Sequence, residues 1–358
     1  LQRQAEKAPA NDRWLRGWIY NHLTIRLCRL GDFWHAQQAA HKSLTCYTDE
    51  ACTYTQAFML IHLSLINIIC GRCAIALEPI RHAEKLIETN HSKDDALNAI
   101  AQVPIAEILF AQNSFVEARQ RLDFAIPVMA SGEGWVDIYV LALETRARIA
   151  LLEEGFGTAI SFVNKGFEIA ATRNLWRLKW AMEALRIEIL CRTHLLADND
   201  QEFENLRVDI NRGSTIDGHK LSWREKIVGR ISLARGAYFK NNLILAEQYL
   251  NEAIAEGESV GAFKFVISAL VLHAIIQSRN ENSYDGLNSF LKAAAIAAPQ
   301  GIYRPFIEEG ASIGSFIRQI LRRHGIGALP PNISEFIVKL QSSISSNQNK
   351  TERLASIF

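Results

Sequence analysis

The residues best suited to chemistry are charged side chains that fall within otherwise apolar helical segments. Glu107, Glu144, Arg148 and Arg235 are of this kind. Glu144 and Arg148 are four residues apart, so they share one face of a helix and can pair with each other. An arginine in apolar surroundings is equally suited to bind a carboxylate or a phosphate. The sequence leaves both interpretations open, a structural ion pair and a ligand contact.

Motifs typical of enzymes or metal sites are lacking. The sequence contains no Gly-x-Ser-x-Gly nucleophile elbow and no His-Glu-x-x-His zinc motif. The string nearest to a phosphate-binding loop, Gly213 to Lys220, has His219 between its last glycine and the lysine, which breaks the loop. Cys70 and Cys73 form a lone Cys-x-x-Cys with no second pair. We therefore expect no catalysis, no metal and no cofactor in this chain.

Composition points to a folded, helical and evenly charged protein. The 358 residues include 39 Lys and Arg against 38 Asp and Glu, which excludes a global field that could hold nucleic acid or a membrane. Only 8 Pro and 20 Gly are present, fewer than sheets with tight turns usually need. No stretch is apolar enough to predict a membrane span. Six unevenly spaced Cys do not resemble a disulfide framework, which favours a cytoplasmic location.

Small residues recur along the chain at a nearly regular spacing. The markers are Ala36, Ala76, Ala118, Ala159, Ala246 and Gly286, each placed early in the second helix of an expected hairpin. Their separations are 40, 42, 41, 87 and 40 residues, and the gap of 87 holds one further unit near Glu202, where the small residue is lost. Matching small residues occur in the first helices at Ala106, Ala147, Ala234 and Ala274. The pattern resembles the tetratricopeptide hairpin, with a period longer than the usual ~34 residues.

The repeats predict an all-α fold: a right-handed superhelix, or α-solenoid, of about seven tetratricopeptide-like helical hairpins. We expect this array to occupy residues 1–300, with capping helices over 301–346 and a polar linker over 347–358. The first helix of each hairpin would line a concave inner wall, a natural place for a ligand. The alternative is an irregular helical bundle in which the spacing is accidental.

Counting back from each marker to the inward positions of the first helix selects the candidate ligand-binding residues. In a tetratricopeptide unit these positions give an apolar wall with a few polar groups, the composition of a small-molecule site. Aromatic residues one turn earlier could stack on a ligand or belong to the core between repeats. The complete candidate set is Tyr54, Phe58, Glu107, Glu144, Arg148, Trp180, His194 and Arg235.

The most specific motif lies where the repeats end. It consists of Ala297 (one place off the usual register), Pro299, Gly301, Arg304, Phe306, Glu308, Glu309 and Gly310. This segment resembles the end of the sensor domain in MalT-like, ATP-dependent transcriptional regulators of the LuxR family. The upstream hairpins fit as well, so the resemblance covers nearly the whole chain, although only this block is specific.

The resemblance implies an effector-binding sensor domain of a transcription activator. In such regulators a small-molecule inducer binds the superhelix and controls oligomerisation and DNA binding by other domains. The nucleotide-binding and helix-turn-helix domains are missing here, so we expect this chain to be a fragment. In the whole regulator, ATP would bind to the absent N-terminal domain and DNA to the absent C-terminal domain. Expected partners are the inducer and those domains, with self-association as a further possibility and no membrane. The alternative is a tetratricopeptide scaffold that binds a peptide or protein.

Overall fold

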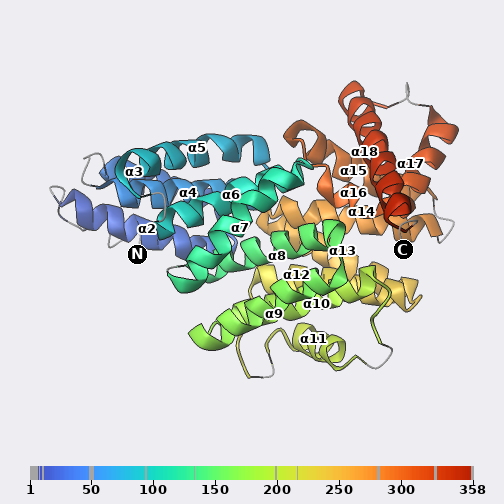
Figure 1. The fold of residues 1–358 in the computed structure, drawn as a ribbon, viewed down its shortest axis with the longest axis horizontal. Helices are drawn as coiled ribbons and strands as arrows, with labels where there is room; N and C mark the ends of the chain where they lie inside the picture. The colour runs from blue at the N-terminus through green and yellow to red at the C-terminus, as the bar shows by residue number, and fades with distance from the viewer. Residues whose placement is uncertain are drawn as a thin grey trace.

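Helical hairpins make up most of the molecule, as Figure 1 shows. The computed structural model describes residues 7, 9, 12–47, 52–92, 95–132, 134–197, 200–215, 217–279, 283–325 and 329–355. The seven hairpins are α2 (Arg13–Leu30) with α3 (Phe33–Cys46), α4 (Thr53–Ile69) with α5 (Cys73–Asn90), α6 (Ala96–Ala111) with α7 (Phe115–Ser131), α8 (Val136–Glu153) with α9 (Phe156–Arg173), α10 (Trp176–Arg192) with α11 (Gln201–Arg212), α12 (Trp223–Phe239) with α13 (Leu243–Val260), and α14 (Phe263–Arg279) with α15 (Ser283–Ala297). The predicted all-α solenoid is confirmed.

The small-residue markers hold the hairpins together as the sequence predicts. Each marker is the fourth residue of its second helix, and the five alanines among them are fully buried. Gly286 shows why small residues are needed, because a Cβ at this position would lie 3.1 Å from the carbonyl oxygen of Ala274 in the paired helix. Larger side chains at these positions would push the two helices apart.

The fifth hairpin achieves its close packing in a different way. Its second helix, α11, has no small marker, and it lies against α12, the first helix of the next hairpin. The small residues are on α12 instead: a Cβ at Gly236 would meet the ring of Phe203 at 2.2 Å, and one at Gly229 would meet Ile210 at 2.6 Å. The close approach of α11 is therefore to the first helix of the next hairpin, and the small residues that permit it are on that helix.

The superhelix closes on itself, so early hairpins contact late ones. The indole Nε1 of Trp223, at the start of α12, donates a 2.9 Å hydrogen bond to the carbonyl oxygen of Cys28 in α2. The same indole packs edge-to-face on Phe33, with ring centroids 5.2 Å apart. Further along, the backbone N–H of Ala74 donates to the side chain of Gln300, 3.1 Å away. Hairpins from both ends of the array therefore border the inner space.

The chain after the repeats turns back toward this inner space. A short 3₁₀ turn, η2 (Ala298–Gln300), leads to the one-turn helix α16 (Arg304–Ile307), followed by α17 (Gly310–His324) and α18 (Pro331–Ala355). The backbone N–H of Tyr303 donates to the carbonyl oxygen of Ala111 in the third hairpin, 2.8 Å away, which ties α16 to the repeats. Residues 347–358 were expected to form a polar linker, but the last helix continues through this segment as far as Ala355. None of the helices in the described ranges is both long and apolar enough to span a membrane.

Enlarging a marker should destabilise the array, whereas enlarging its exposed neighbour should not. We expect Ala76→Leu to lower the free energy of unfolding by about 1–3 kcal/mol because Ala76 is fully buried between two helices. Ala74→Leu, in the same helix but exposed, is the matched control. Thermal and urea unfolding measure both variants. Equal stability of the two would contradict the role assigned to the markers.

Candidate functional site

A cavity of about 90 Å³ lies at the centre of the closed superhelix. First helices from α4 to α14 contribute to its wall, and the segment 302–309 closes it from the C-terminal side. Apolar residues such as Ile68, Phe110 and Ile231 line part of it. Its charged residues are Glu107, Glu144, Arg148, Glu188, Arg192, Arg235, Lys264, Arg304, Glu308 and Glu309, so acidic and basic groups balance.

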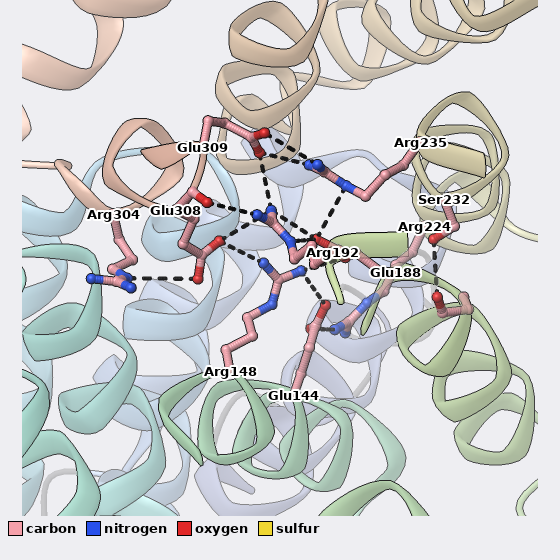
Figure 2. A network of polar contacts seen from close by, with 11 residues as sticks. Glu144, Arg148, Glu188, Arg192, Arg224, Ser232, Arg235, Arg304, Glu308 and Glu309 are labelled. Atoms are coloured by element: carbon pink, nitrogen blue, oxygen red, sulfur yellow. Dashed lines mark hydrogen bonds and ion pairs between the residues drawn. The ribbon is translucent and has the colours of Figure 1, made fainter. Parts of the chain in front are cut away.

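Glu188 is the centre of the charge network in this cavity (Figure 2). Its carboxylate accepts hydrogen bonds from Arg148 Nη2 at 2.7 Å and from Arg192 Nε at 3.1 Å. Arg235 Nε lies 3.8 Å from the same carboxylate. Three guanidinium groups, one each from α8, α10 and α12, thus meet at one glutamate. We call Arg148, Arg192 and Arg235 the arginine cluster.

Two further carboxylates reach the arginine cluster from outside the repeats. Arg235 binds Glu309 through two parallel hydrogen bonds of 2.7 and 3.2 Å, the strongest geometry for this pair. Arg192 donates to Glu309 Oε1 at 3.1 Å and to the backbone carbonyl of Glu308 at 2.9 Å. Arg148 donates to Glu308 Oε2, also at 2.9 Å. Residues 297–310, which we call the C-terminal block, are therefore anchored at the centre of the superhelix by charge.

The pKa values of Glu188, Glu309 and Arg148 are shifted toward their charged forms. Burial by itself would raise the pKa of Glu188, but attraction to Arg148, Arg192 and Arg235 outweighs it and lowers this pKa to about 2. The pKa of Glu309 is likewise lowered to about 2, because Arg235 and Arg192 overcome the cost of burial. Burial opposes a charged Arg148 too, but the surrounding glutamates raise its pKa.

A second group of contacts continues the network toward the other side of the cavity. Lys264 Nζ lies 2.6 Å from Glu107, which also accepts a hydrogen bond from the hydroxyl of Thr145 at 2.6 Å. Glu144 lies 3.6 Å from Arg148 and 3.9 Å from Arg224. The Glu144–Arg148 pair is therefore one edge of a larger network rather than an isolated pair.

A larger cavity of about 440 Å³ adjoins the central one. Six charged residues line both spaces, so the network forms the wall between them: Arg148, Glu188, Arg192, Arg235, Glu308 and Glu309. Beyond this wall the second cavity is lined by His194, Tyr238 and the exposed Arg279, whose guanidinium stacks 4.8 Å from the Tyr238 ring. The buried hydroxyl of Tyr238 has no hydrogen-bond partner within the described residues. These groups can donate hydrogen bonds to a polar or anionic guest.

The structure brings together five of the eight predicted ligand residues. Glu107, Glu144, Arg148 and Arg235 line the central cavity. His194 lines the second cavity, although it lies just beyond the end of α10, in the left-handed region with φ 58°.

Three predicted residues lie elsewhere. Trp180 is 3% exposed and belongs to the hydrophobic core, next to a space of only about 10 Å³. Phe58 packs against His62 and Trp135, with ring centroids 4.6 and 5.0 Å apart. Tyr54 faces His91 across 6.1 Å. Neither Tyr54 nor Phe58 lines the central or the second cavity.

Sequence reasoning missed Glu188 and Arg192 for a geometric reason. The inward positions of each first helix are predicted by counting back a fixed number of residues from the marker in the second helix. This count assumes that the turn between the two helices is short. The turn between α10 and α11 covers residues 193–200, far longer than the two-residue turn between α8 and α9. Counting forward from the start of the first helix finds Glu188, because it is the thirteenth residue of α10, as Arg148 is of α8 and Arg235 of α12; Arg192, the seventeenth, lies outside the counted positions.

No metal site accompanies the charge network in the part of the chain that the structure describes. Groups of three or more His, Cys, Asp and Glu side chains placed to hold an ion are not found there. The carboxylates of the network are paired with arginines instead, as at Glu188 and Glu309. The arrangement can therefore bind charged or hydrogen-bonding groups. Within the described residues it provides no cluster of unpaired carboxylates that could hold a metal ion.

Acid should weaken the network because two of its carboxylates have lowered pKa values. Their stabilising effect is complete above the ordinary glutamate pKa of 4.5 and is lost as the pH falls toward about 2. We expect the thermal midpoint to fall over this window, and to fall less in Glu309→Gln, which has one such group fewer. Unfolding scans at several pH values measure the difference. The same pH dependence in both proteins would contradict the assignment.

Comparison with known proteins agrees with the architecture. Residues 5–323 match the family described as the MalT-like TPR region. The fold is also similar to that of a Rap protein, seen in a crystal structure with Competence and Sporulation Factor: the TM-score is 0.57 at 12% identity, covering 95% of this chain and 97% of that one. A search of curated proteins finds no match to this sequence. Because the family match spans most of the helical array, this chain belongs to the MalT-like TPR region family.

Proposed function

We propose that this chain is the effector-sensing domain of a LuxR-type transcription activator, and that its effector binds in the second cavity next to the charge network. The observation that carries the proposal is the shared wall: residues of the network line both cavities and include Glu308 and Glu309 of the C-terminal block. An effector in this cavity would contact the repeats and the block at once. Sensing requires such a link between the binding site and the rest of the protein.

The lining of the second cavity favours a small molecule that carries an anionic group. Arg279 is a donor on one side, and the arginine cluster is on the other. Leu151, Leu185 and Phe239 supply an apolar surface for the body of the ligand. Apolar side chains next to a set of charged and hydrogen-bonding groups suit a ligand of this kind, and a volume of about 440 Å³ is within the usual range of small-molecule sites.

In this proposal the chain performs no catalysis and needs no cofactor of its own. Binding of the effector shifts the equilibrium between a resting and an active state of the protein. The size of the shift is set by the difference between the effector's affinities for the two states. Nucleotide binding, self-association and DNA binding belong to flanking domains of a cytoplasmic regulator. The effector therefore acts on those domains only through the conformation of the helical array.

A scaffold that binds a peptide or protein is the second candidate. The Rap protein with the similar solenoid was crystallised with Competence and Sporulation Factor, so this architecture accommodates a bound factor in that protein. Against this candidate, the hydrogen bond from Trp223 to Cys28 joins α12 to α2, so an extended chain could not pass between these two helices without breaking it. A small molecule needs no opening of these contacts.

Binding of a defined panel tests the proposal. Sugars, sugar phosphates, mono- and dicarboxylates and short peptides are screened by thermal shift, and positive compounds are measured by calorimetry. A ligand at a hundred times its Kd should stabilise the protein by about 2.7 kcal/mol. We expect anionic small molecules to bind, and Arg279→Ala to weaken them about tenfold through loss of a charge-assisted hydrogen bond, worth roughly 1.4 kcal/mol.

The matched control is Arg207→Ala, which removes a half-exposed arginine of α11 that pairs only with Glu204 among the ion pairs of the described chain. Its affinity for the same compound should equal that of the unaltered protein. Binding of peptides alone would favour the scaffold. If no compound binds, or if Arg279→Ala binds as tightly as the control, the proposed site is wrong.

A further inference from the structure

The arginine cluster has the composition of an anion-binding site that is already occupied. Its three guanidinium groups come from the repeats, and so does Glu188, which all three share. The two carboxylates that complete the network, Glu308 and Glu309, come from the C-terminal block, more than 70 residues further along the chain than Arg235. The block therefore presents to the repeats what an anionic ligand would present.

We propose that Glu308 and Glu309 are an internal competitor: an anionic effector replaces them on the arginine cluster and releases the C-terminal block from the superhelix. This inference rests on the proposed function and names how its site is regulated. Binding and release are then a single exchange, in which one set of anions leaves the guanidinium groups as another arrives.

Charge makes the exchange obligatory. The side chains concerned are mostly buried, from 9% exposed in Arg235 and Glu308 to 23% in Arg148. If the two glutamates withdrew and nothing replaced them, the three guanidinium groups would share Glu188 as their main carboxylate partner. The next carboxylate is that of Glu144, which lies 3.6 Å from Arg148. Leaving buried charges unpaired is strongly unfavourable. An anion that enters the cavity and pairs with the guanidinium groups would therefore favour release of the block.

Space for the incoming anion arises from the same movement. The central cavity of about 90 Å³ and the second cavity of about 440 Å³ are separated by the network, and Glu308 and Glu309 are part of that wall. Withdrawal of these side chains would join the two spaces. The effector could then reach the guanidinium groups from the second cavity, where Arg279 already offers a positive charge.

Arg304 keeps the docked block from being held too tightly. It is 2% exposed, and burial lowers its pKa. Its Nη1 donates to Asn113 at 2.8 Å, but its Nε and Nη2 have no hydrogen-bond acceptor among the described residues, and Glu308 is 3.6 Å from Nε. A buried cation with unmet donors costs free energy in the docked state. That cost is recovered when the segment moves into water.

Aromatic packing would transmit the release of the C-terminal block to α15 and α18. Phe306, on the one-turn helix between the two acidic residues and the repeats, is fully buried. Its ring lies 5.7 Å from that of Phe290 in α15 and 5.2 Å from that of Phe336 in α18. A shift of α16 would therefore disturb the packing of α18, so that α18 responds to the occupancy of the cavity.

The test uses pyrophosphate and citrate as probe anions and hydrogen exchange of residues 302–310 as the readout of release. In the unaltered protein we expect either probe to speed exchange in this segment. In Glu308→Gln/Glu309→Gln, exchange should be fast without any probe, and the probes should bind about tenfold more tightly because the competitor is absent. Sodium chloride at equal ionic strength controls for screening.

Glu335→Gln is the control variant, since Glu335 is an exposed partner of Lys339 on α18, 71% exposed, and takes no part in the network. It should exchange and bind like the unaltered protein. If the double variant does not fold by circular dichroism, the two single variants are measured in the same way. Equal probe affinity with and without the glutamates, or an identical effect of sodium chloride, would overturn the proposal.

The outcomes separate this inference from the proposed function. A panel compound that binds through Arg279 but leaves exchange of residues 302–310 unchanged would refute the competitor and leave the sensor in place. Conversely, probe-driven release in a protein that binds no panel compound would support the competitor and refute the proposed effector site.

Discussion

Charges that are removed from water must be paired, and this constraint organises the centre of the molecule. Three arginines on successive first helices share Glu188, and the repeats do not supply enough carboxylate to neutralise them. Glu308 and Glu309 complete the pairing from the C-terminal block. Because unpaired buried ions are costly, the block is part of the fold rather than an attachment to it.

The same network makes the inner space of the solenoid different from an open groove. Contacts such as Trp223 to Cys28 close the array, and the charged wall divides what is enclosed into a small and a larger cavity. Binding in such a place must alter either the wall or the closure. A repeat array, whose units contact mainly their neighbours, is well suited to spread a local change along its length. This is the physical basis on which a sensing role is proposed.

The repeat fold could be predicted from sequence because its determinants are local. Each hairpin needs one small residue early in its second helix, and Ala36, Ala76, Ala118 and Ala159 recur at almost constant spacing. The fifth hairpin does not follow this rule: its second helix, α11, packs closely on α12 of the next hairpin, where Gly229 and Gly236 provide the space. Its long turn then shifted the count of inward positions.

The sequence by itself determined the seven hairpins, the family resemblance and four of the charged residues that line the central cavity, since all of these follow from periodicity along a helix. Only the tertiary structure decided what those charges do. The partners of Arg148 and Arg235 lie 160 and 74 residues away in Glu308 and Glu309. No local spacing encodes a contact of that separation, because it depends on how far the superhelix turns before the C-terminal block meets its axis.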